Sequence, residues 1–396
     1  MKYIFLFVIF FLSFGYLEAQ QTITNRMVHD GLDRDYHLYI PESYDETINV
    51  PILFVFHGYG GNARNLMRWG DMKSVADTAG FILIVPQGYK DHRGSPHWNV
   101  GSWTRGSIVD DIGFISALID KINENYKVDL DRVYSYGNSN GGYFSFELAC
   151  QLGNKIAAIG SIGGTMSTES YDSCAPSHNT SVITVHGTSD PIVYYTGRRP
   201  YNSKSQVEAL KYWVDYNKTN TSPEIIELPD SDRNDGSQVE LYKYDGGNNG
   251  TSVHHFKVIN GGHSWPGRYG NMDIRATSEI WKFVSKYDIN GLIINQSTNT
   301  EDEINSDEGY GIKLEQNYPN PFNPSTSIDF YLPQMEQVSL TVYNHTGQKI
   351  TDVITGKFLK GNQSEMLNLN SFSSGLYLYR LTTPTHSITK TMTLIK

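Results

Sequence analysis

The sequence predicts an α/β main domain built on a doubly wound, mostly parallel sheet, followed by a small all-β sandwich unit. Apolar runs at 51–56 and 81–85 are typical of strands buried on both faces of a parallel sheet. A longer segment at 108–126 carries apolar residues at helical spacing, so strands and helices alternate along the chain. From about residue 312 onward, short β-rich runs alternate with turn residues instead.

The main domain is expected to open with a hairpin, because polar and apolar residues alternate from 22 to 39. A short β-rich run at 132–136 leads through a glycine turn into a helix at 144–150. Ligands of such sheets bind beyond the carboxyl ends of the strands, so a site is expected there. Further strands are expected at 156–162, 181–186, 253–259, 339–343, 348–354 and 376–381, and further helices at 66–79, 206–216 and 274–287.

Composition and the N-terminus indicate a folded, secreted protein. A net charge of −10 and a pI near 5.6 argue against binding to nucleic acid or to anionic membranes. Lys2 and the apolar run 3–14 are typical of a cleaved signal peptide, with a membrane anchor as the alternative, and no later stretch reaches transmembrane length. We therefore expect a signal peptide at 1–19, a main domain at 22–295, a linker at 296–311 and a β-rich domain at 312–396.

The chain has two cysteines, Cys150 and Cys174. In an oxidising compartment, a pair separated by 24 positions favours one disulfide, with two buried thiols as the alternative. No cluster of His, Cys and carboxylate residues has the spacing of metal ligands. Neither a metal nor an organic cofactor is therefore expected.

The stretch around Ser139 has the spacing of a nucleophile elbow, Gly137-x-Ser139-x-Gly141. The expected strand, turn and helix surround it in the order that this motif requires. Glycine fits both flanking positions because the strand and the helix approach so closely there that a Cβ would collide with a neighbour. The alternative is a glycine-rich turn without chemistry.

A serine hydroxyl needs a base to act as a nucleophile, and the base needs a carboxylate to orient it. The expected chain order is Ser, acid, His, which Ser139, Asp190 and His263 satisfy. Asp190 and His263 both lie in loops that leave expected strands, whereas we expect His186 to pack at its strand end. Alternative acids are Asp172, Asp215, Asp230 and Asp245, and alternative bases are His254 and His255.

A serine nucleophile that forms a tetrahedral intermediate also needs N–H donors for the oxyanion. We expect these donors to be the backbone N–H of Asn140 and that of Tyr59, in the glycine-rich stretch 57–61; the alternative for 57–61 is a turn that merely requires glycine. Flat aromatic rings could bind a substrate ring, or could pack beneath loops. The candidates are Trp98, Trp103 and Trp265, with Tyr194 and Tyr195.

Together these motifs resemble the secreted poly(3-hydroxybutyrate) depolymerase and feruloyl/acetylxylan esterase group of α/β-hydrolases. The resemblance covers about 22–290 and implies the α/β-hydrolase fold, the Ser139, Asp190 and His263 triad, and a Cys150–Cys174 bridge. Asn138 is an atypical polar residue inside the elbow. The matching motifs are 57–61, 137–142, 186–190 and 262–267, with 110–114, whose Asp110 and Asp111 we expect to cap or charge a helix N-terminus.

The C-terminal unit resembles a type IX secretion sorting domain, from its opening at 314–326 and its closing segment 375–377. This resemblance implies export by outer-membrane secretion machinery, and a carbohydrate-binding sandwich is the alternative. The sequence thus predicts a secreted serine esterase that acts on feruloyl or acetyl esters of plant cell-wall polysaccharide. The alternatives are a polyhydroxybutyrate (polyester) depolymerase and a non-catalytic surface-binding protein on the same fold.

Overall fold

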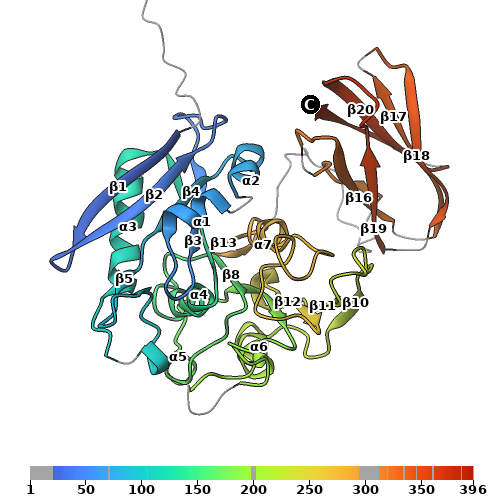
Figure 1. The fold of residues 1–396 in the computed structure, drawn as a ribbon. Helices are drawn as coiled ribbons and strands as arrows, with labels where there is room; N and C mark the ends of the chain where they lie inside the picture. The colour runs from blue at the N-terminus through green and yellow to red at the C-terminus, as the bar shows by residue number, and fades with distance from the viewer. Residues whose placement is uncertain are drawn as a thin grey trace, which may run out of the picture. The chain divides into compact units, whose positions relative to one another are not determined.

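The computed structural model describes residues 21–293 and 312–395, apart from gaps at 70–71, 105, 198–201, 319, 333–334, 345, 359–360 and 385. The chain divides into two compact units, one ending at Ile294 and one beginning at Asn295 (Figure 1). The expected signal peptide and the expected linker both lie outside the described residues.

In the described part of the first unit, ten strands form one sheet of order β1-β2-β4-β3-β7-β8-β9-β12-β11-β10. The central strands, from β4 to β12 in this order, run parallel, and the strands at both edges are antiparallel. Figure 1 shows the blue β1–β2 hairpin at one edge. The bounds are β1 (Gln21–His29), β2 (Leu32–Ile40), β3 (Val50–Phe56), β4 (Ile82–Pro86), β7 (Val128–Asn138), β8 (Ala158–Ile162), β9 (Ser181–Gly187), β10 (Glu224–Glu227), β11 (Gln238–Tyr244) and β12 (Val253–Ile259).

Helices cover both faces of this sheet. Successive residues of β8 point to opposite faces, and each meets a different helix. A Cβ on Gly160 would lie 2.8 Å from Ile280 of α7, whereas the next residue, Ser161, faces Gly142 of α4. None of the described helices is long and apolar enough to cross a bilayer. The helices are α1 (Ala63–Trp69), α2 (Met72–Ala79), α3 (Asp111–Asn125), α4 (Asn140–Gln151), α5 (Thr168–Ser173), α6 (Gln206–Asn217) and α7 (Ala276–Val284).

Most expected elements of this unit are present, and the differences have local causes. The helical stretch expected at 66–79 falls on two helices, α1 and α2. Strands β10 and β11 were not expected; they lie at the sheet edge and carry many charged residues. Short elements complete the unit: β5 (Tyr89–Lys90), β6 (Pro96–His97), β13 (Tyr287–Asp288), β14 (Gly291–Leu292) and 3-10 turns at Ser102–Thr104 and Asn248–Gly250.

The predicted disulfide is present and joins Cys150 in α4 to Cys174, the residue that follows α5. Because α4 begins at the elbow, the bridge fixes the far end of the helix on which the elbow depends. The alternative of two buried thiols is therefore wrong.

The second unit is the expected β-sandwich. Its described residues form two antiparallel sheets, β15-β16-β19 and β18-β17-β20-β21. Apolar residues from both sheets, such as Phe330 and Leu340, share one core. The bounds are β15 (Lys313–Leu314), β16 (Ser325–Leu332), β17 (Glu336–Asn344), β18 (Lys349–Phe358), β19 (Gly361–Asn368), β20 (Gly375–Thr382) and β21 (Ser387–Leu394).

Candidate active site

Ser139 occupies the sharp turn between β7 and α4. Its backbone has φ 55° and ψ −119°, a conformation that costs a non-glycine residue about 1–3 kcal/mol. The flanking glycines are required by close contacts: a Cβ on Gly137 would lie 2.4 Å from the backbone of Gly141, and one on Gly141 would lie 2.3 Å from the carbonyl oxygen of Phe56. The Ser139 side chain makes no capping hydrogen bond to α4, so its hydroxyl is not used by the helix.

Asp190 and His263 are brought together by the loops after β9 and β12. The carboxylate Oδ2 of Asp190 accepts a hydrogen bond of 2.7 Å from Nδ1 of His263. Backbone bonds join the two loops, because Ser189 N–H donates to the carbonyl of Gly261 at 2.9 Å. A Cβ on Gly187 would lie 2.2 Å from that same carbonyl oxygen, so glycine permits the close approach.

The side chain of Asp190 is fully buried, yet it remains ionised. Burial alone would raise its pKa, but hydrogen bonds from His186, His263 and the Ile192 N–H outweigh burial and hold the pKa well below its usual range. The N–H groups of Ile192 and Val193 both donate to Oδ1 at 2.8 Å. The acid is therefore a rigid, charged acceptor for the His263 ring.

His186 is buried at the end of β9, as expected, but it also contacts the acid. Its Nε2 donates to the carbonyl of Val193 at 2.8 Å and lies 3.3 Å from Oδ2 of Asp190. This second contact with Asp190 was not predicted. The sequence signal for this contact was the four-residue spacing from His186 to Asp190, because that spacing places both residues on one strand-to-loop turn.

Ser139 and His263 both contact the segment that ends β8. Ser139 N–H donates to the carbonyl of Ile162 at 2.8 Å, and a Cβ on the next residue, Gly163, would lie 3.3 Å from Cε1 and Nδ1 of His263. Among the described contacts, no hydrogen bond joins the Ser139 hydroxyl to the His263 ring. Such bonds are often long in unliganded sites and shorten when substrate binds. The three side chains therefore belong to one end of the sheet, beyond β7, β9 and β12.

The segments that carry the two expected oxyanion donors both lie next to Ser139. A Cβ on Gly58 would lie 3.3 Å from Cβ of Ser139, so the 57–61 loop that carries Tyr59 runs directly beside the serine. Asn140 is the first residue of α4, where a backbone N–H has no carbonyl partner within the helix. Asn138 donates from Nδ2 to the carbonyl of Ile162 at 3.2 Å and so bridges β7 and β8.

His57 anchors the first of these segments. Its Nε2 accepts the N–H of Gly88 at 2.9 Å, and burial lowers its pKa to about 4. The ring is therefore neutral at ordinary pH, as an acceptor nitrogen requires.

The three candidate tryptophans lie in different surroundings. Trp98 is fully buried, and Trp265 is 7% exposed, with its edge against Tyr136. Both side chains match the packing alternative. Trp103 is half-buried and its ring contacts the exposed ring of Tyr59. Tyr59 was not among the aromatic candidates; it belongs to the 57–61 loop that runs beside Ser139, and with Trp103 it offers partly open aromatic surface next to that loop.

Most of the alternative acids and bases have partners of their own. His254 binds Asp245 at 2.8 Å, and His255 is buried against Tyr195 and Thr184. Asp215 pairs with Lys211 on the same helix, and Asp172 lies 3.7 Å from Lys204. Within the described residues, no group of three or more His, Cys, Asp or Glu side chains could hold a metal ion.

The sheet order and the strained serine at the end of its central strand define the class of protein: the first unit has the α/β-hydrolase fold. Residues 34–204 match the model of the family described as esterase PHB depolymerase. Residues 316–396 match the model described as secretion system C-terminal sorting domain, which indicates type IX export to the cell surface or extracellular space.

Two named relatives and one solved structure are similar to this chain. A bifunctional acetylxylan esterase/xylanase of Neocallimastix patriciarum is 26% identical over 275 residues, which are 69% of this chain and 36% of that protein. A probable feruloyl esterase C of Aspergillus niger is 27% identical over 242 residues, which are 57% of this chain and 80% of that protein. The solved acetyl xylan esterase from Aspergillus awamori has a TM-score of 0.49 and 14% identity, covering 67% of this chain and 99% of its own.

Proposed function

We propose that the protein is a secreted serine esterase in which Ser139, His263 and Asp190 form the catalytic triad. The observation that carries this proposal is the 2.7 Å bond between His263 and the buried, ionised Asp190, at the same end of the sheet as the strained Ser139. A carboxylate only accepts hydrogen bonds, so Nδ1 of His263 carries the proton and Nε2 is left as the base.

In the proposed reaction, the Ser139 hydroxyl attacks the ester carbonyl while Nε2 of His263 takes its proton. Asp190 stabilises the imidazolium that forms. The N–H groups of Tyr59 and Asn140 bind the oxyanion of the tetrahedral intermediate. His263 then protonates the departing alkoxide, and water, activated by the same nitrogen, releases the acyl group from Ser139.

We propose that the substrates are feruloyl or acetyl esters of plant cell-wall polysaccharide. The names of the relatives support this substrate class, and the partly open aromatic pair of Tyr59 and Trp103 provides a surface for a planar ring. The C-terminal unit would deliver the enzyme through the outer-membrane secretion machinery to such polymers.

The second candidate is polyester hydrolysis by the same residues, which the description of the matched family favours. The test is a panel of methyl ferulate, acetylated xylan and polyhydroxybutyrate granules, assayed with the full chain. We expect release of ferulate or acetate, and Ser139→Ala should lower kcat by about 10⁶-fold.

The matched control is Ser43→Ala, which removes an exposed hydroxyl that binds the backbone of Asp77. It should leave the rates unchanged. Faster release from granules than from both plant esters would favour the polyester alternative. A Ser139→Ala variant as active as the wild type would exclude the triad.

A further inference from the structure

Trp98 connects the two segments that carry the proposed oxyanion donors. Its indole Nε1–H donates to the carbonyl of His57 at 3.0 Å, at the start of the loop that carries Tyr59. Its backbone N–H donates to Oδ1 of Asn140 at 2.7 Å, and its carbonyl accepts from Nδ2 of Asn140 at 3.0 Å. One residue therefore binds both sides of the proposed oxyanion hole.

Packing gives Trp98 little freedom to move. The indole is fully buried, stacks on Phe144 of α4 with ring centroids 4.9 Å apart, and meets the edge of Phe56 at 5.0 Å. The Asn140 side chain is also fully buried. Because both partners are fixed, a shift of Trp98 would move the backbone at His57 and at Asn140 together.

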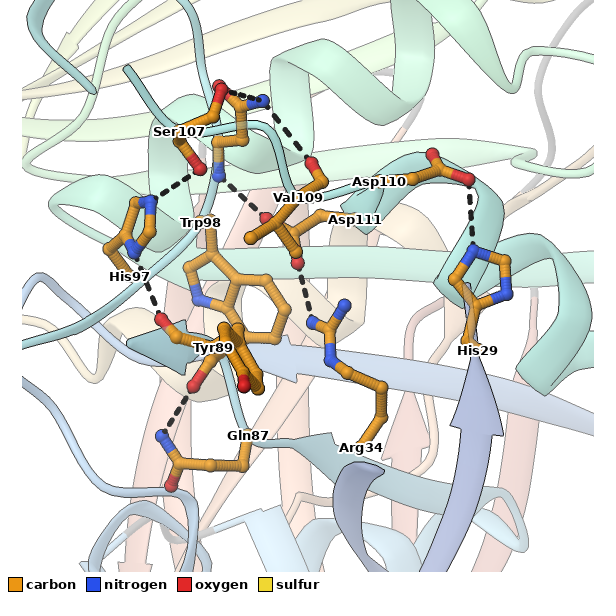
Figure 2. Close-up of polar contacts among 12 residues, drawn as sticks. His29, Arg34, Gln87, Tyr89, His97, Trp98, Ser107, Val109, Asp110 and Asp111 are labelled. Atoms are coloured by element: carbon orange, nitrogen blue, oxygen red, sulfur yellow. Dashed lines mark hydrogen bonds and ion pairs between the residues drawn. The ribbon is translucent and has the colours of Figure 1, made fainter. Parts of the chain in front are cut away.

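The position of Trp98 is in turn fixed by an ion pair beneath its loop (Figure 2). The N–H of the next residue, Asn99, donates to Oδ2 of Asp111 at 2.7 Å. The other oxygen of Asp111 accepts from Nη2 of Arg34 at 2.5 Å, and both side chains are 1% exposed. The guanidinium also lies 4.0 Å from the centre of the Phe114 ring.

The remainder of the loop is held by its own polar contacts. Asn99 Nδ2 donates to the carbonyl of Val109 at 3.3 Å. The His97 ring joins the carbonyl of Tyr89 to the hydroxyl of Ser107, at 2.9 and 2.8 Å. A buried ion pair is weak evidence for stability, because desolvation offsets its attraction. Its placement under a site loop therefore invites a functional reading.

We propose that Arg34 and Asp111 are positioning residues for the oxyanion hole, acting through Asn99 and Trp98 on the backbone N–H groups of Tyr59 and Asn140. This inference rests on the proposed esterase function. Both carboxylates lie at the start of α3, as expected: Asp110 caps the helix by accepting the N–H of Gly113 at 2.8 Å, and Asp111 is the acidic residue of its first turn. The positioning role of Asp111 is additional.

The test is steady-state kinetics of the full chain on 4-nitrophenyl acetate. Trp98→Phe keeps the packing and removes the N–H to His57, and Asn140→Ala removes the side-chain pair but keeps the backbone donor. Asp111→Asn removes the charge opposite Arg34. We expect each to lower kcat about 10- to 100-fold, with KM changed less than about threefold, because misplaced oxyanion donors weaken transition-state binding.

Two further readouts separate positioning from simple loss of structure. The pH profile of kcat/KM should keep its wild-type shape, since the His263–Asp190 bond is untouched. Trp98→Phe combined with Asp111→Asn should be no slower than the slower single variant, because both act through one path. The matched control, Asp110→Asn, retains a helix-capping residue at a half-exposed position and should keep kcat within about twofold.

The proposal fails if the folded variants retain wild-type kcat, or if the losses multiply in the double variant. Trp98→Phe and Asn140→Ala decide the outcome if Asp111→Asn does not fold. A wild-type protein that hydrolyses no ester would instead overturn the proposed function, which is a distinguishable result.

Discussion

Two buried carboxylates of the first unit, Asp190 and Asp111, are held in different ways. Asp190 is bonded by two backbone N–H groups and two histidines, and these donors keep its pKa well below the usual range although burial opposes them. For Asp111, burial raises the pKa against the Arg34 charge and the Asn99 N–H. The two pKa shifts therefore have opposite signs: hydrogen bonds outweigh desolvation at Asp190, whereas desolvation outweighs the Arg34 charge and the hydrogen bonds at Asp111.

The partners of these carboxylates also differ in chemistry. The partner of Asp190 is a histidine, the residue type that most often accepts and donates protons during enzyme reactions. The partner of Asp111 is an arginine, a residue type that suits a fixed anchor because its planar group forms rigid charge-assisted hydrogen bonds. The comparison suggests that Asp190 serves proton transfer, whereas Asp111 serves geometry.

Among the substitutions at these carboxylates, Asp190→Asn is expected to have the largest effect on kcat. The amide can donate to His263 and favour the wrong tautomer, so kcat should fall by about 10⁴-fold with little change in KM. Steady-state kinetics on 4-nitrophenyl acetate measure this. Asp215→Asn, at an exposed helix position, is the control. A loss of kcat below tenfold would contradict the view that Asp190 serves proton transfer whereas Asp111 serves geometry.

Asp111→Asn should have the larger effect on stability. It leaves the Arg34 charge buried without its counter-ion, which costs about 3–5 kcal/mol in unfolding free energy. Urea unfolding followed by fluorescence measures the change. An unfolding free energy within 1 kcal/mol of the wild type would show that Arg34 does not depend on Asp111.

The pH dependence of the unfolding free energy should also distinguish Asp190 from Asp111. The pKa of Asp190 is depressed on folding, so its contribution is present above about pH 4, the pKa of an unfolded Asp, and is lost as the pH falls through the lower folded value. The pKa of Asp111 is raised, so its contribution is present below about pH 4 and is lost as the pH rises through the folded value.

Urea titrations between pH 3 and 7 should therefore show opposite trends. On acidification, the advantage of the wild type over Asp190→Asn should shrink below about pH 4. Its advantage over Asp111→Asn should grow as the pH falls toward 4. The same sign of slope for both variants would contradict the assigned pKa shifts.

Asp110→Asn should have the smallest effect on the unfolding free energy. The Asp110 carboxylate binds His29 at 2.9 Å but is half-exposed, and exposed ion pairs contribute about 0–1 kcal/mol. Asparagine also caps helices well. A change in unfolding free energy above 2 kcal/mol would show that adjacent carboxylates at this helix start act as one unit.

The three candidate catalytic residues could be predicted from the sequence, whereas the residues that pack around and position the site could not. Ser139, Asp190 and His263 each follow a recognisable strand, so parallel topology alone carries them to one edge; their catalytic roles stay predictions. The function of Trp98 could not be read from spacing, because it depends on contacts with Asn140, 42 positions away. Nor does sequence distinguish a buried tryptophan such as Trp98 from a partly open one such as Trp103.

The central claim is that Ser139 is a nucleophile activated by His263 and Asp190. The most direct measurement is to treat the full chain with a fluorophosphonate and to locate the adduct by peptide mass spectrometry. We predict a single adduct on Ser139, formed far more slowly in Asp190→Asn. An adduct on another residue, or no adduct with the wild-type protein, would contradict the account.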